Sequence, residues 1–209
     1  MSQIAEKDGL DRLVEAKQAK LLAAMRDAPL AEMAHPAPLQ LEATIALYGR
    51  YPVGTLRNLA RDRLRWIPPG ASWNGPDLFE FIPKATDPFG FVRQSGEAIW
   101  PQNMITDIGT IPRLAGVLLR GLTPWGYAAA FLVHDWEFEQ HHCRRTAKTF
   151  EQVRDTMMEC VKTLMETGLA PKSQVNFWLL YQGINSAVAR KYWDRDPPSC
   201  TLPDYRPEA

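Results

Sequence analysis

The sequence predicts an α+β fold that is mainly helical, with a small antiparallel sheet followed by a cluster of about four helices, and a helical arm at the N-terminus. Two patterns predict this class. Apolar residues recur at helical spacing towards both ends of the chain, whereas short alternating aromatic segments fill residues 78–102. The length of 209 residues and the hydrophobic content of 45% are enough for one sizeable core. We therefore expect one main domain with extensions.

Residues 1–77 are expected to form the N-terminal helical arm and a linker. An amphipathic pattern over residues 8–27 predicts a helix that docks either on the domain or on another chain. A Pro- and Ala-rich linker follows at 27–39, and further helical patterns run over 41–48 and 56–64.

Three arginines, Arg57, Arg61 and Arg65, recur at four-residue spacing around the last of these patterns. They are either a stripe that contacts phosphates or a solvated helix face. We favour the solvated face, because the chain is neutral overall.

Residues 78–193 are expected to form the main domain, in which strands precede helices. The segments LFEFI (78–82), FGFVR (89–93) and EAIW (97–100) are separated by turn signals and predict the antiparallel sheet. A polar loop follows at 103–110.

Three helix signals follow the polar loop. Thr123 and Pro124 predict a helix start, and the residues after them are apolar on every side, which indicates a buried helix. An amphipathic helix is predicted over 147–167, closed by Gly168, and Pro171 opens another. The Pro-rich residues 194–209 are expected to form a tail without regular structure.

The bulk composition excludes several classes of protein. Equal numbers of basic and acidic residues, 24 of each, argue against a general nucleic-acid footprint. The three scattered cysteines give no disulfide framework, so a reducing compartment is expected. We find neither a signal peptide nor an apolar run long enough for a transmembrane helix.

A histidine and an aspartate stand side by side in the predicted buried helix. A buried carboxylate costs several kcal/mol unless it is paired, hydrogen-bonded or bound to a metal, so Asp135 must meet a partner. His134 is either a satisfied core histidine or a general base. In the upstream loop, Asp107 either satisfies backbone amides or binds a cation.

Other polar side chains of this helix receive structural interpretations. Glu137 and Glu139 are expected either at its solvent-exposed end or as partners of Arg144 and Arg145. Zinc binding is disfavoured at the consecutive residues His141, His142 and Cys143, because neighbouring side chains diverge by about 100° on a helix.

Two motifs, TDIGTIPR (Thr106 to Arg113) and HDWEF (His134 to Phe138), resemble those of an uncharacterised, largely phage-borne family. Members of that family carry TDxx(S/T)IPR followed by HDWxY. The resemblance covers about 78–193 and implies a phage protein of the virion or the host cytoplasm, assembled with other phage protein chains as a homo- or hetero-oligomer. The motif residues that carry it are Thr106, Asp107, Thr110, Pro112, Arg113, His134, Asp135 and Trp136.

The HDWxY helix is in turn similar to the catalytic helix of phospholipase A2 enzymes, where a histidine activates water and the adjacent aspartate binds calcium. That similarity implies His134 as a general base, and Asp135 and Asp107 as ligands of a calcium ion. The chemistry is consistent, because imidazole titrates near neutral pH and calcium prefers oxygen ligands.

The chain departs from the family pattern at two positions. Phe138 replaces the tyrosine of HDWxY, and Arg154 stands where family members tend to place an aspartate. An arginine there predicts a structural ion pair of Arg154 with Asp135, or else with Glu137 or Asp107. The first hypothesis is therefore a non-catalytic virion component that needs no cofactor. The alternative is a calcium-dependent hydrolase of lipid or cell-envelope esters.

Overall fold

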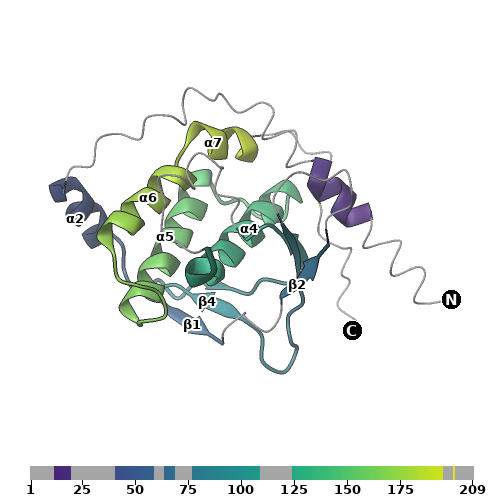
Figure 1. Ribbon diagram of the computed structural model, residues 1–209, viewed down its shortest axis with the longest axis horizontal. Helices are drawn as coiled ribbons and strands as arrows, with labels where there is room; N and C mark the ends of the chain where they lie inside the picture. The colour runs from purple at the N-terminus through teal and green to yellow at the C-terminus, as the bar shows by residue number, and fades with distance from the viewer. Residues whose placement is uncertain are drawn as a thin grey trace.

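The computed structural model describes residues 12–19, 41–58, 64–68, 77–108, 124–194 and 200. The architecture is α+β, with two small antiparallel sheets and a helical cluster formed by the C-terminal half, as predicted (Figure 1). The helices are α2 (Leu41–Arg50), the 3-10 helix η2 (Pro124–Tyr127), α4 (Ala128–His142), α5 (Phe150–Glu166), α6 (Gln174–Ile184) and α7 (Ala187–Trp193). The strands are β1 (Thr55–Arg57), β2 (Leu64–Ile67), β3 (Leu78–Phe81), β4 (Gly90–Val92), β5 (Ala98–Ile99) and β6 (Met104–Thr106). Residues 12–19 form a further helical segment.

The strands form two three-stranded sheets, ordered β1-β4-β5 and β2-β3-β6, instead of the single sheet that was predicted. The strand positions after residue 78 are confirmed, but β3 and β4 lie in different sheets. Part of the predicted polar loop is strand β6, whose three residues are all buried. Alternation along a segment identifies a strand, whereas its partners depend on residues far away in the sequence.

The predicted division of the chain at residue 77 does not separate an arm from a domain. Helix α2 packs against α6, and strands β1 and β2 complete the two sheets, so residues 41–58 and 64–67 belong to the same fold. The helix predicted over 56–64 is wrong, because β1 and β2 occupy parts of it. Pairing with β4 and β3 overrides the local helical spacing. Arg65 on β2 pairs with Glu80 opposite it on β3, and Arg61 lies outside the described residues.

Helix α4 is buried on nearly all sides, as its sequence predicts, and it contacts α5, α7 and β6. The helical segment begins at Pro124 as a turn of 3-10 helix and becomes α-helical at Ala128. The two carboxylates of its second half, Glu137 and Glu139, are also buried, 5% and 0% exposed. Their predicted place at a solvent-exposed end is wrong.

Helix α5 has strong local signals at both ends. Thr149 and Gln152 form a capping box, and Gly168 follows the helix with φ +75°, a conformation that favours glycine. The helix predicted to start after Pro171 begins at Gln174, with Ser173 as its N-cap. A second cap, at Ser186, separates α7 from it.

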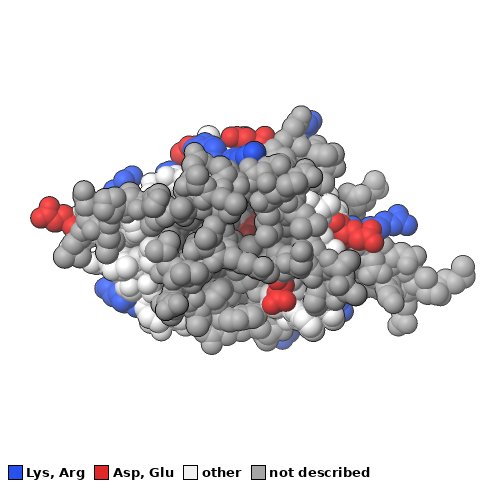
Figure 2. Space-filling view, turned by 45° about the horizontal axis from the view of Figure 1, so that its top comes forward, with Lys and Arg blue, Asp and Glu red and all other residues white. Residues whose placement is uncertain are grey.

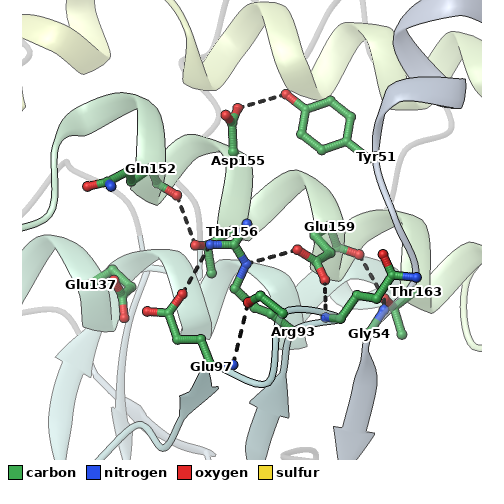
Figure 3. A network of polar contacts seen from close by, with 12 residues as sticks. Tyr51, Gly54, Arg93, Glu97, Glu137, Gln152, Asp155, Thr156, Glu159 and Thr163 are labelled. Carbon is green, nitrogen blue, oxygen red and sulfur yellow. Dashed lines mark hydrogen bonds and ion pairs between the residues drawn. The ribbon is translucent and has the colours of Figure 1, made fainter.

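A buried polar network joins α5 to the turn between β4 and β5 (Figure 3). The Glu159 carboxylate, 1% exposed, accepts hydrogen bonds from Arg93 Nε at 2.8 Å and from the Gln94 amide at 2.6 Å. Lys148, which precedes α5, pairs with both Glu97 and Glu137. Burial raises the pKa of the Glu137 carboxyl, and Lys148 opposes that rise.

A disulfide joins Cys143, at the C-terminal end of α4, to Cys200 in the tail. The expectation that the cysteines form no disulfide is therefore wrong. An odd number of scattered cysteines does not reveal which two meet in space. The third, Cys160, is a buried free thiol whose pKa is raised by burial.

Candidate functional site: a closed charged cluster on helix α4

Asp135 lies beside strand β6 and is 9% exposed. Its Oδ2 accepts a hydrogen bond from the hydroxyl of Thr106, and that hydroxyl oxygen accepts the amide of Ile108 at 2.9 Å. The partner that the buried carboxylate requires is therefore a neighbouring side chain. The contact ties α4 to the end of β6.

His134 lies next to this carboxylate. Its Nδ1 is 3.6 Å from Asp135 Oδ1, and its ring packs on Phe138 with centroids 4.3 Å apart. The other ring nitrogen, Nε2, is buried and has no hydrogen-bond partner in the described structure. Since most buried polar atoms are hydrogen-bonded, this nitrogen is the unusual feature of the site.

The loop that carries Asp107 has a strained backbone. Ile108 has φ +49°, a conformation that is rare for a β-branched residue and costs roughly 1–3 kcal/mol. The hydrogen bond from its amide to Thr106 helps to hold this geometry. Thr110, Pro112 and Arg113, which carry the rest of the motif, lie outside the described residues.

The helical segment 12–19 inserts a lysine into the cluster. Lys17 is 3% exposed, and its Nζ lies 2.8 Å from Oε1 of the fully buried Glu139. Burial alone would lower the pKa of Lys17. Attraction by Glu139, with smaller contributions from Tyr192, Asp135 and Asp107, outweighs burial and raises that pKa well above its ordinary value. Lys17 is therefore a protonated ammonium at neutral pH.

Tyr192 reaches the same cluster from α7. Burial raises the pKa of its phenol, and the nearby charges of Lys17, Glu139, Asp107 and Asp135 act on it. Its ring stacks on Phe138 at 5.8 Å, and its carbonyl accepts a hydrogen bond from His142 Nε2 at 3.0 Å. Phe138, which stands at the tyrosine position of the HDWxY motif, is thus part of an aromatic cluster with α7.

Arg154 does not reach this cluster. Its guanidinium pairs with Asp155 at 2.8 Å and donates to Asn185 Oδ1 at 2.9 Å, and it lies over the ring of Tyr181. The predicted ion pair between Arg154 and Asp135 is wrong. The guanidinium extends towards α6, where the carboxylate of the next residue is its nearest charge.

The residues that complete the cluster, Lys17, Glu139 and Tyr192, were missed by reasoning from the sequence. One signal was present for the first two. Lys17 follows Leu10, Leu13 and Val14 at helical spacing, so it stands in the apolar stripe of its own helix. Glu139 follows Asp135 by four residues on a helix predicted to be buried.

Trp136 is partly buried and packs against the main core. Within the described ranges, no three or more His, Cys, Asp or Glu side chains are grouped as metal ligands. None of the helices in those ranges has the length and apolar character that crossing a bilayer requires.

The fold and the site define an α+β protein whose central helix carries a buried cluster of opposite charges. No protein-family model, no curated protein and no solved structure matches the chain. The function must therefore be argued from the cluster itself and from the motifs.

Proposed function

We propose that the protein is a phage-encoded, non-catalytic component of the virion or of its assembly, in which the His134–Asp135 site has become structural. One observation carries the proposal: protein groups complete the charged cluster. Thr106 donates to Asp135, and the Lys17 ammonium occupies the cluster as an internal cation beside Glu139. The assignment to a phage rests on the resemblance of the TDIGTIPR and HDWEF motifs.

The position of the cation explains why a structural role fits. A hydrolase of the phospholipase A2 kind needs a cation that polarises the substrate, and that cation must leave ligand positions open. The Lys17 ammonium has no such positions, because it is a hydrogen-bond donor only. It is also covered on all sides, at 3% exposure.

The surface supports a role in packing against partner chains. Large apolar side chains are exposed on the two sheets, namely Trp66 on β2 at 51%, Ile82 after β3 at 43% and Trp100 after β5 at 38%. On the face seen in Figure 2, the described acidic and basic side chains form small separate groups. The chain has no formal net charge at pH 7, which favours protein partners over a polyanion.

Calcium titration and a hydrolysis assay on one set of proteins test the proposal. We would measure calcium binding by calorimetry, and fatty-acid release from phosphatidylglycerol vesicles with calcium present, for the wild type, His134→Ala and Asp135→Asn. The expected result is no binding heat and no release above the blank for any of the three. Hydrolysis by the wild type that His134→Ala abolishes in a folded protein would overturn the proposal.

The second candidate is a hydrolase of lipid or cell-envelope esters, and the state of His134 favours it. No protein group is hydrogen-bonded to Nε2, so this ring nitrogen is available to a water molecule that enters the site when it opens. Asp135 and Asp107 then bind calcium, after displacement of Lys17 and of the Thr106 hydroxyl. A calcium signal that Asp135→Asn removes would favour this candidate.

A further inference from the structure

We infer that the socket filled by Lys17 is an assembly site, and that it accepts the N-terminal helical segment 12–19 of a second copy of this chain. The socket consists of Glu139 on α4, with Leu78, Ile105 and Ile67 on the sheet β2-β3-β6. Leu13 and Val14 pack on Leu78 and Ile105, and Lys17 pairs with Glu139. The inference rests on the proposed role as an assembly component and names the partner.

The socket needs an occupant. Glu139 is fully buried when Lys17 is in place, and removing one member of a buried ion pair leaves the other uncompensated. The apolar floor adds to this need, because Leu78 and Ile105 are only 2% and 1% exposed while the helical segment is docked. An arm of this sequence satisfies both requirements, whichever copy supplies it.

The chain geometry allows either copy to supply the arm. Segment 12–19 and helix α2 lie at opposite ends of the molecule in Figure 1. Residues 20–40 connect them, and fully extended they span at most roughly 70 Å. A chain of this length has a radius of gyration of about 17 Å when folded, so the connection can also reach a neighbouring socket.

Reciprocal exchange gives a closed assembly. Each copy donates one arm and offers one socket, so two copies that exchange arms fill both sockets and form a two-fold dimer. In dilute solution the arm of the same chain competes at high effective concentration. Exchange is therefore expected where copies are crowded together, as in a particle under assembly.

A charge swap removes this competition. In Lys17→Glu, the arm carries a negative charge that its own Glu139 repels. In Glu139→Lys, the socket carries a positive charge that repels its own Lys17. Each variant alone has no matching pair. Mixed one to one, the two variants match only across chains, and both sockets of a mixed dimer are filled. The double variant, Lys17→Glu with Glu139→Lys, restores the pair within one chain and is the control.

The measurement is the mass in solution after the two variants are refolded together from urea, by light scattering on a sizing column. We expect a doubling of mass for the mixture, from 23.7 kDa, and a monomer for the folded double variant. A mixture that stays monomeric or fails to fold, next to a folded double variant, would overturn the inference.

If the double variant does not fold, a second experiment tests the inference in chains that keep Lys17 and Glu139. A chain with Val14→Cys is mixed with a chain with Ile67→Cys at high concentration, and a short bismaleimide is added. Both positions pack on Leu78 and Ile105, so a covalent dimer of doubled mass is expected from exchange. The inference would be refuted if the yield of covalent dimer were no greater than in a control in which every chain carries Val14→Cys.

The result is separate from the test of the proposed function. Absence of hydrolysis without exchange would refute this inference alone. Hydrolysis together with exchange would refute the structural role and leave the partner assignment intact.

Discussion

The Nζ of Lys17 lies 2.8 Å from Oε1 of Glu139, and the two side chains are 4% and 1% exposed. These residues are 122 positions apart in the sequence. A pair so far from water holds the N-terminal segment in one register, because any shift would leave two buried charges without partners.

Lys17→Met is expected to release the segment 12–19 from the domain. Breaking a buried pair costs about 3 kcal/mol or more, and detachment of the segment is the cheapest way to hydrate Glu139. Native-state hydrogen exchange of residues 12–19 should accelerate by about 100-fold or more. Lys17→Met combined with Glu139→Leu, which removes both charges, should keep most of the protection. Unchanged exchange in the single variant would contradict the prediction.

Thr106→Val is expected to lower the free energy of unfolding by about 1.5–3 kcal/mol, because the buried carboxylate of Asp135 loses its donor. The Ile108 amide loses its acceptor in the same variant. Urea denaturation measures the change. Thr106→Ser keeps the hydroxyl and should lose less. A Thr106→Val protein as stable as the Ser variant would show that the hydrogen bond contributes nothing.

The pH dependence of stability should contain a contribution from Glu137. Burial raises the pKa of this carboxyl in the folded state, so the folded state holds its proton where the unfolded state has released it. Its contribution therefore favours folding at acid pH and declines as pH rises from about 4.3 through the raised pKa. Glu137→Gln should match the wild type near pH 4 and become relatively more stable towards pH 7. Urea midpoints across that range test it, and a constant difference between the proteins would contradict it.

Reduction of the Cys143–Cys200 disulfide is expected to lower the free energy of unfolding by about 4 kcal/mol, the loop-closure value for a separation of 57 residues. Guanidinium denaturation with and without a thiol reductant measures the loss. Cys160→Ala should remain sensitive to the reductant, since its thiol is free, and Cys143→Ala with Cys200→Ala should be insensitive. Equal sensitivity of the double variant would point to a different cause.

Gly54→Ala should be more destabilising than Gly90→Ala. A Cβ at Gly54 would lie 2.5 Å from the Val92 carbonyl, in the backbone of β4, which cannot move alone. The three atoms nearest to a Cβ at Gly90 all belong to the ring of Trp100, which is 38% exposed and can turn aside. Overpacking of this kind costs about 1–3 kcal/mol, and we expect that loss for Gly54→Ala in thermal unfolding. The reverse order would show that Trp100 is held more rigidly than its exposure suggests.

Local signals made part of this fold predictable. The glycine at 168 and the proline at 124 mark helix ends through contacts within a few residues, so those two boundaries follow from the sequence. The capping box at Thr149 was not recognised, and α5 begins at Phe150, three residues after the predicted start. The class α+β follows from the same patterns. Strand partners do not, because the pairings of β1 with β4 and of β2 with β3 join segments that the sequence keeps apart.

Only part of the cluster on α4 could be predicted from the sequence. The position of His134 and Asp135 on a buried helix follows from periodicity alone. Thr106 was recognised as a motif residue, but its hydroxyl could not be assigned to Asp135 without the sheet that places β6 beside α4. Arg154 was assigned to Asp135 because of its position in the helix. Its actual partners are the adjacent Asp155 and Asn185 at the end of α6.

The N-terminal segment 12–19 and Cys200 near the C-terminus are both attached to the last turn of α4. Glu139 holds Lys17, and Cys143, four residues further on, holds Cys200. The two attachment points are about 6 Å apart along the axis of α4. Tension applied between the ends of the oxidised protein would therefore run through the ion pair, this single turn and the disulfide. Leu13 and Val14 would share this load through their contacts with Leu78 and Ile105, so the ion pair and this apolar patch of the sheet β2-β3-β6 would have to separate before the remaining helices carry any load.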